Sequence, residues 1–407
     1  AALARLKAAT GLIAAEWFGA PSQALEVLAV TGTNGKTSTA WWLAHALSNL
    51  KHLALSPCAL VGTLGIGMPD ALESTGMTTP DPVRLQRAFR QFADAGVRTC
   101  AIEASSIGLA EHRLAGTRIR VALFTNFTQD HLDYHASMDA YWQAKTALFD
   151  WLALQAAVVN IDDTRGAELH RSLQGRGLDL WSVSMHQDAR LRATDIGWGD
   201  GGLRFTVVEG ADRQVLQTAM IGDYNVSNVL CALAMAAALG RDPLALAPSL
   251  ASFPGVPGRM ERVEAGQAFP IFIDYAHTDD ALRNALRMLR DITPGRVLCV
   301  YGCGGDRDRG KRPAMTKAVA DLAHLAWATA DNPRKESLDR IFADMREGLG
   351  PLPTVEFVTD RRDAIGRALA AAKAGDCVVI AGKGHETTQE FADTVVPFDD
   401  RQVVREI

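Results

Sequence analysis

Short apolar runs rich in β-branched residues alternate with helix-spaced segments along most of the chain. This alternation is typical of a mostly parallel β-sheet with helices on its faces, and it predicts an α/β fold. Before residue 192 the pattern predicts strands over Leu25–Val30, Val97–Ile102, Ile119–Phe124 and Ala156–Ile161, and helices over Thr37–Leu50 and Met138–Trp151.

Two segments interrupt this pattern. Residues 192–221 alternate around Gly201 and Gly202 as an antiparallel hairpin does, which predicts a meander at the sheet edge. Residues 252–258 hold two Pro and two Gly in SFPGVPG, and we place a domain boundary there. The strands predicted beyond it, which indicate a second, doubly wound α/β domain, are Ile271–Tyr275, Arg296–Tyr301, Ala326–Ala330, Val355–Val358 and Cys377–Ile380.

Composition and charge narrow the class of protein. The chain has 407 residues, of which 48% are hydrophobic and 22% charged, which excludes disorder and collagen-like repeats. Its formal net charge of -5 offers no electrostatic footprint for nucleic acid. The six cysteines lack metal-binding spacing, and no apolar stretch approaches the roughly 20 residues that span a bilayer. We therefore expect a cytoplasmic protein without nucleic-acid or membrane partners.

The segment Val30–Ser38, VTGTNGKTS, lies where a predicted strand passes into a helix. Backbone N–H groups of such a Gly-rich turn bind phosphate oxygens, a Lys at the position of Lys36 neutralises them, and the Thr37 hydroxyl is placed to ligate Mg²⁺. Val30 stands where the strict phosphate-loop motif has its first Gly. The alternative is an ordinary turn with a solvated Lys.

Polar residues also follow later strands in the same half, namely Glu103, Asn126, Asp130 and His131. The carboxyl ends of parallel strands converge on one crevice, so Glu103 and His131 are candidates for metal ions bound with ATP. A helix cap for Glu103 and a structural role for His131 are the alternatives. Lys145 lies on the following helix, where the sequence alone predicts a solvated side chain.

In the second half, four predicted strands end in polar or Gly-rich motifs. Charged and Gly residues at successive strand ends indicate one lined cleft rather than simple connections. A flexible solvated turn at residues 302–313 and an ordinary helix entry at residues 383–385 remain alternatives. The motifs are DYAH (Asp274–His277), YGCGGDRDRGKRP (Tyr301–Pro313), ADNPR (Ala330–Arg334) and AGKGHE (Ala381–Glu386).

Together these motifs resemble those of the Mur ligases of peptidoglycan synthesis, over nearly the whole chain. They occur in the family's order, beginning with TGTNGKTS and continuing with TTPD (78–81), EASS (103–106), TNFTQDHLDYH (125–135), the Lys145 helix, NVSN (225–228), GRME (258–261), DYAH, GCGGDRDRGKRP, DNPR and GKGHE. The resemblance implies a central phosphate-loop ATPase domain followed by a Rossmann-like domain. It also implies an ATP-dependent ligase that forms an amide through an acyl phosphate.

The resemblance also implies roles for individual residues. ATP and Mg²⁺ are the implied cofactors, with Lys145 carbamylated beside a second Mg²⁺ and Arg259 reaching the terminal phosphate when the domains close. The implied catalytic residues are Lys36, Lys145, His131 and Arg259, and the implied metal ligands are Thr37, Glu103, His131 and Lys145. The implied nucleotide-binding residues are Gly32, Thr33, Asn34, Gly35, Lys36, Thr37, Ser38, Asn225, Asn228 and Arg259.

The implied substrates are UDP-N-acetylmuramoyl-L-alanyl-D-glutamate and meso-diaminopimelate. A planar guanidinium at Arg334 suits the distal carboxylate of diaminopimelate, which lysine lacks. Three residues depart from the family pattern: Ile107, Glu111 and Asp279, of which Glu111 puts a negative charge near an anionic substrate. The implied substrate-binding residues are Thr78, Thr79, Ser105, Glu111, Arg113, Arg312, Asp331, Asn332, Arg334, Gly382 and Glu386.

The same resemblance divides the chain into a remnant of a uridine-binding domain (1–24), a central ATP-binding domain (25–253) and an amino-acid-binding domain (254–407), in an expected monomer. Three other functions remain open. One is a folylpolyglutamate synthetase, which shares the architecture. Another is a phosphate-loop ATPase that couples hydrolysis to a partner's conformation without forming a ligated product, and the third is a binding protein without catalytic activity.

Overall fold

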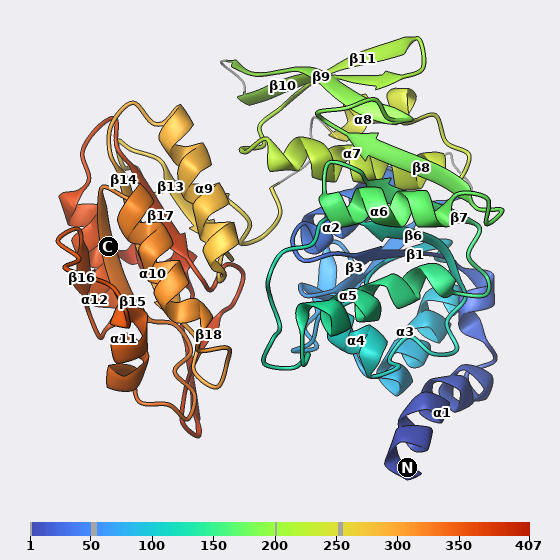
Figure 1. Ribbon diagram of the computed structural model, residues 1–407, viewed down its shortest axis with the longest axis horizontal. Coiled ribbons are helices and arrows are strands. Elements are labelled where there is room, and N and C mark those ends of the chain that lie inside the picture. Colours follow the sequence, from blue (N-terminus) through green and yellow to red (C-terminus); the bar gives the residue numbers. More distant parts are fainter. Residues whose placement is uncertain (1, 50–54, 200–201, 251–254) are drawn as a thin grey trace. The chain divides into compact units, whose positions relative to one another are not determined.

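The computed structural model describes residues 2–49, 55–199, 202–250 and 255–407, and it divides into two compact units, Ala1–Pro254 and Gly255–Ile407 (Figure 1). Each unit has its own mostly parallel sheet covered by helices, so the predicted α/β fold class is confirmed. Three predicted features, Leu50, Gly201 and the segment 252–254 of the SFPGVPG boundary, lie outside the described residues.

The first unit is built on an eleven-stranded sheet in the order β11-β10-β9-β8-β7-β6-β1-β5-β2-β3-β4. Its strands from β9 to β2 run parallel, and the pairs on either side are antiparallel. The edge meander predicted for residues 192–221 is therefore confirmed as β9 to β11. The strands are β1 (Glu26–Thr31), β2 (Cys58–Gly62), β3 (Gly65–Met68), β4 (Ala71–Glu73), β5 (Thr99–Glu103), β6 (Ile119–Phe124), β7 (Ala156–Asn160), β8 (Asp179–Ser184), β9 (Leu191–Gly199), β10 (Gly202–Glu209) and β11 (Asp212–Thr218).

Helices α2 to α6 lie between these strands along the chain, whereas α1 precedes β1, and α7 and α8 follow β11. The helix predicted over Met138–Trp151 is shorter than expected, because the α-helix ends at Thr146 and continues as the 3₁₀ turn η2 (Ala147–Asp150). A second 3₁₀ turn, η1 (Pro21–Ala24), precedes β1. The α-helices are α1 (Ala2–Trp17), α2 (Lys36–Asn49), α3 (Pro82–Asp94), α4 (Ser106–Ala110), α5 (Met138–Thr146), α6 (Thr164–Leu173), α7 (Tyr224–Ala237) and α8 (Pro243–Leu250).

The second unit has a six-stranded sheet in the order β12-β13-β17-β14-β15-β16, in which only the β12–β13 pair is antiparallel. All five strands predicted for this half are present. A separate hairpin, β18–β19, follows them. The elements are β12 (Glu261–Val263), β13 (Ile271–Asp274), α9 (Asp279–Ile292), β14 (Val297–Cys303), α10 (Lys311–Leu322), β15 (Leu325–Ala330), α11 (Leu338–Arg346), β16 (Val355–Phe357), α12 (Arg361–Ala371), β17 (Cys377–Ala381), β18 (Thr388–Phe391), β19 (Thr394–Pro397) and α13 (Asp400–Glu406).

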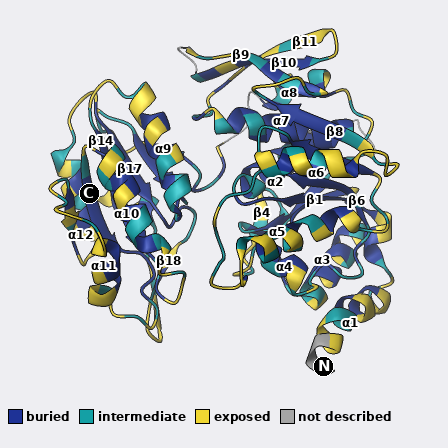
Figure 2. Cartoon of the chain, in the orientation of Figure 1, coloured by how far each residue is buried: buried dark blue, intermediate teal, exposed yellow. Residues whose placement is uncertain are grey.

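The central strands of both sheets are buried, whereas the covering helices expose their outer faces (Figure 2). In β1, β5, β14 and β17 nearly every residue is buried, as expected for parallel strands covered on two faces. The rigid sheets thereby fix the strand ends from which the polar loops start. Among the described residues, no helix is long and apolar enough to cross a membrane.

Candidate active site

The phosphate loop joins β1, which ends at Thr31, to α2, which begins at Lys36. Gly32 has φ of 140° and Gly35 has φ of 84°, conformations that favour glycine. A Cβ on Gly32 would also clash with the Thr125 hydroxyl. The two loop glycines are therefore required by the shape of the turn, as they are in a phosphate-binding loop.

Residues after β6 brace this loop. The backbone N–H of Thr33 donates to the Asn126 carbonyl at 2.8 Å, and the N–H of Asn34 donates to Asn126 Oδ1 at 2.8 Å. The Thr125 hydroxyl donates to the Asn34 carbonyl at 2.6 Å. Asn126, which the sequence placed at a strand end, thus lies directly against the loop.

Two lysines converge on the loop. Lys36 Nζ donates to the carbonyls of Gly32 (2.9 Å) and Thr33 (2.8 Å), and Lys145 Nζ donates to the Gly32 carbonyl at 2.6 Å. Two ammonium groups therefore share one neutral acceptor. This arrangement concentrates positive charge where the loop would meet phosphate.

Lys145 is buried, so the solvated position that the sequence alone indicated is wrong. Its Nζ lies 4.4 Å from the centre of the Tyr141 ring, and the Tyr141 hydroxyl lies 3.2 Å from the Thr33 hydroxyl. Burial, and secondarily the charge of Lys36, lower the pKa of Lys145 well below its ordinary value. The neutral amine is thereby made accessible at a more moderate pH than for an exposed lysine.

Glu103 and Thr37 meet beside the loop. The Thr37 hydroxyl donates to Glu103 Oε2 at 3.0 Å, and Thr63 donates to the same carboxylate from its N–H (2.8 Å) and its hydroxyl (3.2 Å). Glu103 is buried, and the helix-cap alternative does not describe these contacts. In the part of the chain that the structure describes, no group of three or more His, Cys, Asp or Glu residues has the arrangement of a metal site. A hydroxyl with one carboxylate nevertheless suits Mg²⁺, which is commonly completed by phosphate oxygens and water.

His131 follows β6 with a left-handed backbone, φ of 54°. Its Nε2 lies 3.5 Å from Asp130 Oδ2, and burial is the main cause that lowers its pKa, with Lys36 and Lys145 acting in the same direction. A neutral imidazole is the form that binds metal ions. Its ring also lies edge-on to Tyr141, with ring centres 6.0 Å apart, which places His131 on the side of Lys145.

The residues expected to hold the muramoyl dipeptide form one hydrogen-bonded cluster. The Thr79 hydroxyl donates to the Glu103 carbonyl at 2.7 Å and lies 3.0 Å from the Ser105 hydroxyl. Arg113 Nη1 donates to the Thr79 carbonyl at 2.8 Å, and the hydroxyls of Thr78 and Thr63 lie 3.0 Å apart. These predicted residues are therefore brought to the carboxyl end of β5, next to Glu103.

The negative charge of Glu111 has partners within this unit. Its carboxylate accepts hydrogen bonds from the Lys7 ammonium and the Tyr134 hydroxyl. These two bonds lower the pKa of Glu111, whereas burial and the carboxylate raise the pKa of Tyr134 to about 12. The charge that departs from the family pattern is thus compensated by a lysine of α1.

Asn225 and Asn228 lie in the first turns of α7, and both are buried. Asn228 Nδ2 donates to Asn225 Oδ1 at 3.1 Å, and a Cβ on Gly35 would clash with Asn228 Oδ1. The Asn228 amide therefore lies against the second glycine of the phosphate loop, and Asn225 is bonded to it. Ser38 is buried in the first turn of α2 on the same loop.

In the second unit, the ends of β15 and β17 meet. Asn332 Nδ2 donates to Glu386 Oε2 at 2.8 Å. Gly382 has φ of 112°, and a Cβ there would lie 2.5 Å from Asp331 Oδ2. The structure thus brings together Asp331, Asn332, Gly382 and Glu386, which the sequence placed after two predicted strands and which follow β15 and β17, on either side of β14.

Arg334 is held at the same edge in a left-handed conformation, φ of 51°. Its Nε lies 2.9 Å from Glu390 Oε2, and its Nη1 donates to the Gly305 carbonyl at 3.0 Å. Its side chain remains 23% exposed. A non-glycine residue in this conformation is strained, and the contacts with Glu390 and Gly305 hold the Arg334 side chain in place.

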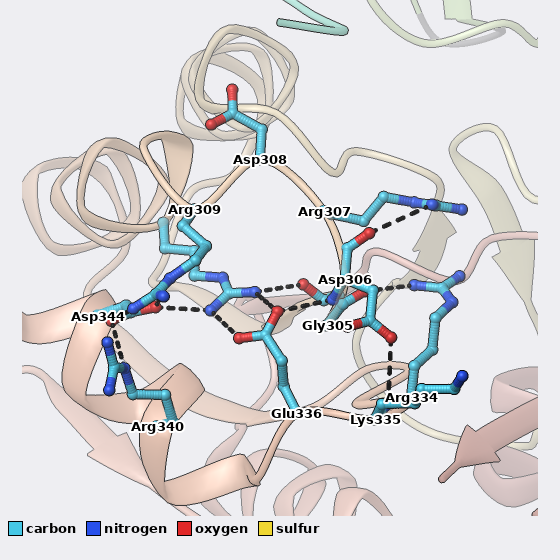
Figure 3. Close-up of polar contacts among 12 residues, drawn as sticks. Gly305, Asp306, Arg307, Asp308, Arg309, Arg334, Lys335, Glu336, Arg340 and Asp344 are labelled. Carbon is cyan, nitrogen blue, oxygen red and sulfur yellow. Dashed lines mark hydrogen bonds and ion pairs between the residues drawn. The ribbon is translucent and has the colours of Figure 1, made fainter. Parts of the chain in front are cut away.

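Arg312 corrects one prediction. Its guanidinium is fully buried, with both Nη atoms donating to Glu336 (2.9 and 2.8 Å), and with further bonds to Asp344 Oδ2 (2.6 Å) and the Gly304 carbonyl (3.0 Å). Arg309 donates to the same Asp344 with Nε and Nη2, each at 2.8 Å (Figure 3). Arg312 therefore anchors the loop before α10, and the geometry does not offer it to a ligand.

Arg307 is the residue of this loop that sequence reasoning missed. Figure 3 shows Arg307 and Arg334 on the side of the loop away from Asp344, and a Cβ on Gly304 would lie 3.2 Å from Arg334 Nη1 and 3.6 Å from Arg307 Cγ. The sequence GDRDRGKR offers three arginines, and only the backbone shows which of them shares the Arg334 side.

Arg259 stacks on the Tyr275 ring, with its guanidinium carbon 4.2 Å from the ring centre. Asp274 accepts from the backbone N–H groups of Met260 (2.7 Å) and Ala276 (2.9 Å). Burial is the main cause that raises the pKa of Asp274, although Arg259 opposes it. The GRME and DYAH motifs are thus one local structure in the second unit.

Both units match models of known protein families. The Mur ligase middle domain matches residues 30–236, and the Mur ligase glutamate ligase domain matches residues 258–384. The chain belongs to the Mur ligase family.

Among Mur ligases, the UDP-N-acetylmuramoyl-L-alanyl-D-glutamate–2,6-diaminopimelate ligase of Acidovorax sp. (strain JS42) is 60% identical over 407 residues, covering 98% of this chain and 81% of that protein. The enzyme of the same name from Ectopseudomonas mendocina (strain ymp) is 43% identical, covering 95% and 79%. A solved structure of a ligase with this name superimposes with a TM-score of 0.69 at 36% identity, covering 98% of this chain and 82% of that one.

The Mur ligase fold extends to other enzymes. A folylpolyglutamate synthase from Mycobacterium tuberculosis, complexed with ADP and AMPPCP, superimposes with a TM-score of 0.74 over 92% of both chains, at 20% identity. At this identity the likeness shows the shared fold alone.

Of the three departures from the Mur ligase pattern, Asp279 lies in the first turn of α9, where an acidic side chain interacts favourably with the helix dipole. Ile107 lies half-buried in α4.

Proposed function

We propose that the chain is an ATP-dependent ligase that adds meso-diaminopimelate to the D-glutamyl carboxylate of UDP-N-acetylmuramoyl-L-alanyl-D-glutamate. The observation that carries the proposal is the contact of Thr37 with Glu103 beside a loop on which Lys36 and Lys145 converge. This combination suits a nucleotide triphosphate with its metal ion. The names of the 60% and 43% identical relatives support the choice of substrates.

Backbone N–H groups of residues 32–38 and the Lys36 ammonium would bind the ATP phosphates, with Asn225 and Asn228 on the adenine side. Arg259, which lies in the second unit, would contribute its charge to the terminal phosphate. Phosphoryl transfer depends mainly on positioning and charge neutralisation, and these residue types supply both. A cytoplasmic location is part of the proposal, because ATP is available there. A monomeric state is also part of the proposal.

Thr37 and Glu103 would hold Mg²⁺, and His131 and a carbamylated Lys145 would hold a second ion, which together neutralise charge on the transferred phosphoryl group. Addition of CO₂ requires a neutral amine, and burial of Lys145 favours that form. A carbamate would replace the cation at Lys145 by an anion. Its contact with the Gly32 carbonyl would then have to change.

Thr78, Thr79, Ser105 and Arg113 would hold the muramoyl dipeptide, with its carboxylate directed at the terminal phosphate. Carboxylates do not acylate amines at neutral pH, so ATP must first convert the carboxylate to an acyl phosphate. An amine of diaminopimelate then attacks the acyl carbon, and inorganic phosphate leaves. Glu111, which already binds Lys7 and Tyr134, is a weaker candidate for direct substrate contact.

Diaminopimelate would bind in the second unit at Asp331, Asn332, Gly382 and Glu386. Its distal carboxylate would face Arg334, with Arg307 in place of the buried Arg312. Two guanidinium groups on one side of the loop suit a carboxylate, because a guanidinium binds it in a planar, bidentate geometry.

The test is phosphate release from ATP by the purified chain, with the dipeptide nucleotide and diaminopimelate added separately and together. A ligase releases phosphate at a substantial rate only when both are present, and it forms the tripeptide nucleotide in equal amount. Phosphate release in the absence of both the dipeptide nucleotide and diaminopimelate would instead support a coupling ATPase. Release that depends on a folate and glutamate would support a folylpolyglutamate synthetase.

A further inference from the structure

Lys383 is a buried cation in the second unit to which neither the motifs nor the family resemblance gave a role. It follows the end of β17 between Gly382 and Gly384, and its side chain is 0% exposed. Its ammonium lies 3.0 Å from Glu386 Oε2 and donates to Asn332 Oδ1 at 3.2 Å. Both partners belong to the pocket proposed for diaminopimelate.

These contacts fix the orientation of the Asn332 amide. Asn332 Oδ1 accepts from Lys383 Nζ and from the Glu390 backbone N–H at 3.1 Å, and both of these groups can only donate. The amide nitrogen must therefore point the other way, where it donates to Glu386 Oε2. An Asn side chain without such donors is free to turn over, with its two ends exchanged.

The same contacts orient Glu386. Lys383 and Asn332 both donate to one carboxylate oxygen, Oε2, while 29% of the Glu386 side chain remains exposed. The carboxylate is thus held from its buried side and presented to the pocket. A carboxylate held in this way suits an ammonium group, of which diaminopimelate carries two.

Stability alone is a weak reason for Lys383. Moving an ammonium from water into the protein interior costs free energy that an ion pair offsets only in part, and an apolar side chain of similar length often stabilises as well. A buried lysine is better explained by the orientation that it imposes on its partners.

We propose that Lys383 is a positioning residue for the incoming amino acid. It holds Glu386 and Asn332 in the geometry that binds an ammonium of diaminopimelate, and it does not itself touch the substrate. The inference rests on the proposed function and deepens it by naming what fixes the amino-acid site.

The experiment compares Lys383→Met with the parent chain in steady-state kinetics. Loss of the charge-assisted contacts should raise the KM for diaminopimelate about 10- to 100-fold, with kcat at saturating diaminopimelate within a few fold of the parent. The KM values for ATP and the dipeptide nucleotide should stay unchanged. Lys317→Met, which removes an exposed lysine of α10 in the same unit, is the matched control and should leave all four constants unchanged.

Lys383→Met should fold, because the partly exposed Glu386 carboxylate is not left as a fully buried charge. Should it prove unstable, Lys383→Gln, which retains a donor for Asn332 but no charge, should show the same selective rise in KM. In a Glu386→Gln background, Lys383→Met should add little, since most of its effect passes through that carboxylate.

An unchanged KM for diaminopimelate in Lys383→Met, or an equal loss of affinity for all substrates with a lowered melting temperature, would overturn the inference and leave a structural lysine. A parent chain without diaminopimelate-dependent turnover would instead overturn the proposed function, so the two failures are distinguishable.

Discussion

The two candidate sites are built on the same plan but with opposite partners for their cations. In each unit, polar loops start from the carboxyl ends of buried parallel strands. In the first unit, Lys36 and Lys145 donate to the neutral carbonyl of Gly32. In the second, Arg334 and Lys383 are paired with the carboxylates of Glu390 and Glu386, and the buried Arg312 behind the loop is paired with Glu336.

The difference matches the charge of the ligands that we propose. A triphosphate is a polyanion, and Lys36, which is bonded to carbonyl oxygens of the loop, can exchange those weak partners for phosphate at little cost. An amino acid carries charges of both signs, so its site needs oriented cations and oriented anions together. Pairing Arg334 and Lys383 with carboxylates fixes their directions and lowers the net positive charge of the site.

Lys36→Ala tests this difference between the two sites most directly, because it removes the cation that we propose to bind the ATP phosphates. We expect ligation to fall by about a thousandfold or more, because electrostatic stabilisation of transferred charge is usually the largest catalytic contribution. The measurement is phosphate release with both substrates at saturating ATP. Lys317→Ala, which removes an exposed lysine of the second unit, is the control and should retain full activity. Near-normal turnover of Lys36→Ala would remove the phosphate-loop assignment.

Lys145→Ala tests the second lysine of the same loop, and we expect a loss of about a hundredfold or more because the second metal ion would lose a ligand. If Lys145 acts as a carbamate, a small added carboxylate such as acetate should restore part of the activity, because it supplies the missing anion. Bicarbonate should restore none, since no amine remains to take up CO₂. Activity equal to the parent would return Lys145 to a structural role as the partner of Tyr141 and Gly32.

Arg334→Ala tests the site in the second unit, where the cations are paired with carboxylates. In the parent, diaminopimelate should be preferred over lysine by about a hundredfold in kcat/KM, because loss of a buried charge-assisted pair costs roughly 2 to 5 kcal/mol. The variant should lose most of its activity with diaminopimelate and narrow this gap, with an unchanged KM for ATP. Equal rates with the two amino acids in the parent would contradict the assignment of Arg334 while leaving the ligase reaction intact.

The strands and the loops at their ends could be predicted from the sequence, because burial of parallel strands imposes continuous apolar runs. The loop Val30–Ser38 was recognisable since its glycines are required by backbone shape. The place of Lys145 was not predictable, because the burial of a helix side chain depends on what packs against it. Here that neighbour is the phosphate loop, more than a hundred residues away in sequence.

The same limit applies to charged clusters. GDRDRGKR gives no sign that Arg312 is enclosed by Glu336 and Asp344, whereas Arg307 lies on the Arg334 side. Glu111 looked unfavourable for an anionic substrate until the fold placed Lys7 beside it. Long-range pairs of this kind leave no local pattern in a sequence, so they are found only once the strands are assembled.

The smallest expected effect concerns an ion pair of the second unit away from its pocket. Arg296 Nη2 lies 2.6 Å from Asp376 Oδ2, and the hydrogen bonds from Arg296 lower the pKa of Asp376 from its ordinary value to about 2. A carboxyl with a depressed pKa in the folded state stabilises the fold above its ordinary pKa, and this contribution is lost as the pH falls through the lower value. Asp376→Asn should therefore lower the free energy of unfolding by about 1 to 2 kcal/mol at pH 7, a modest amount because Arg296 is partly exposed to screening solvent.

Urea unfolding at several pH values measures this effect. The difference in the free energy of unfolding between Asp376→Asn and the parent should be at full size above about pH 4 and should shrink towards pH 2. Asp321→Asn, which alters an exposed pair on α10, should show little difference at any pH. A difference for Asp376→Asn that stays constant across this range would show that the side chain stabilises the fold through hydrogen bonds that do not depend on its charge, and not through the ion pair with Arg296.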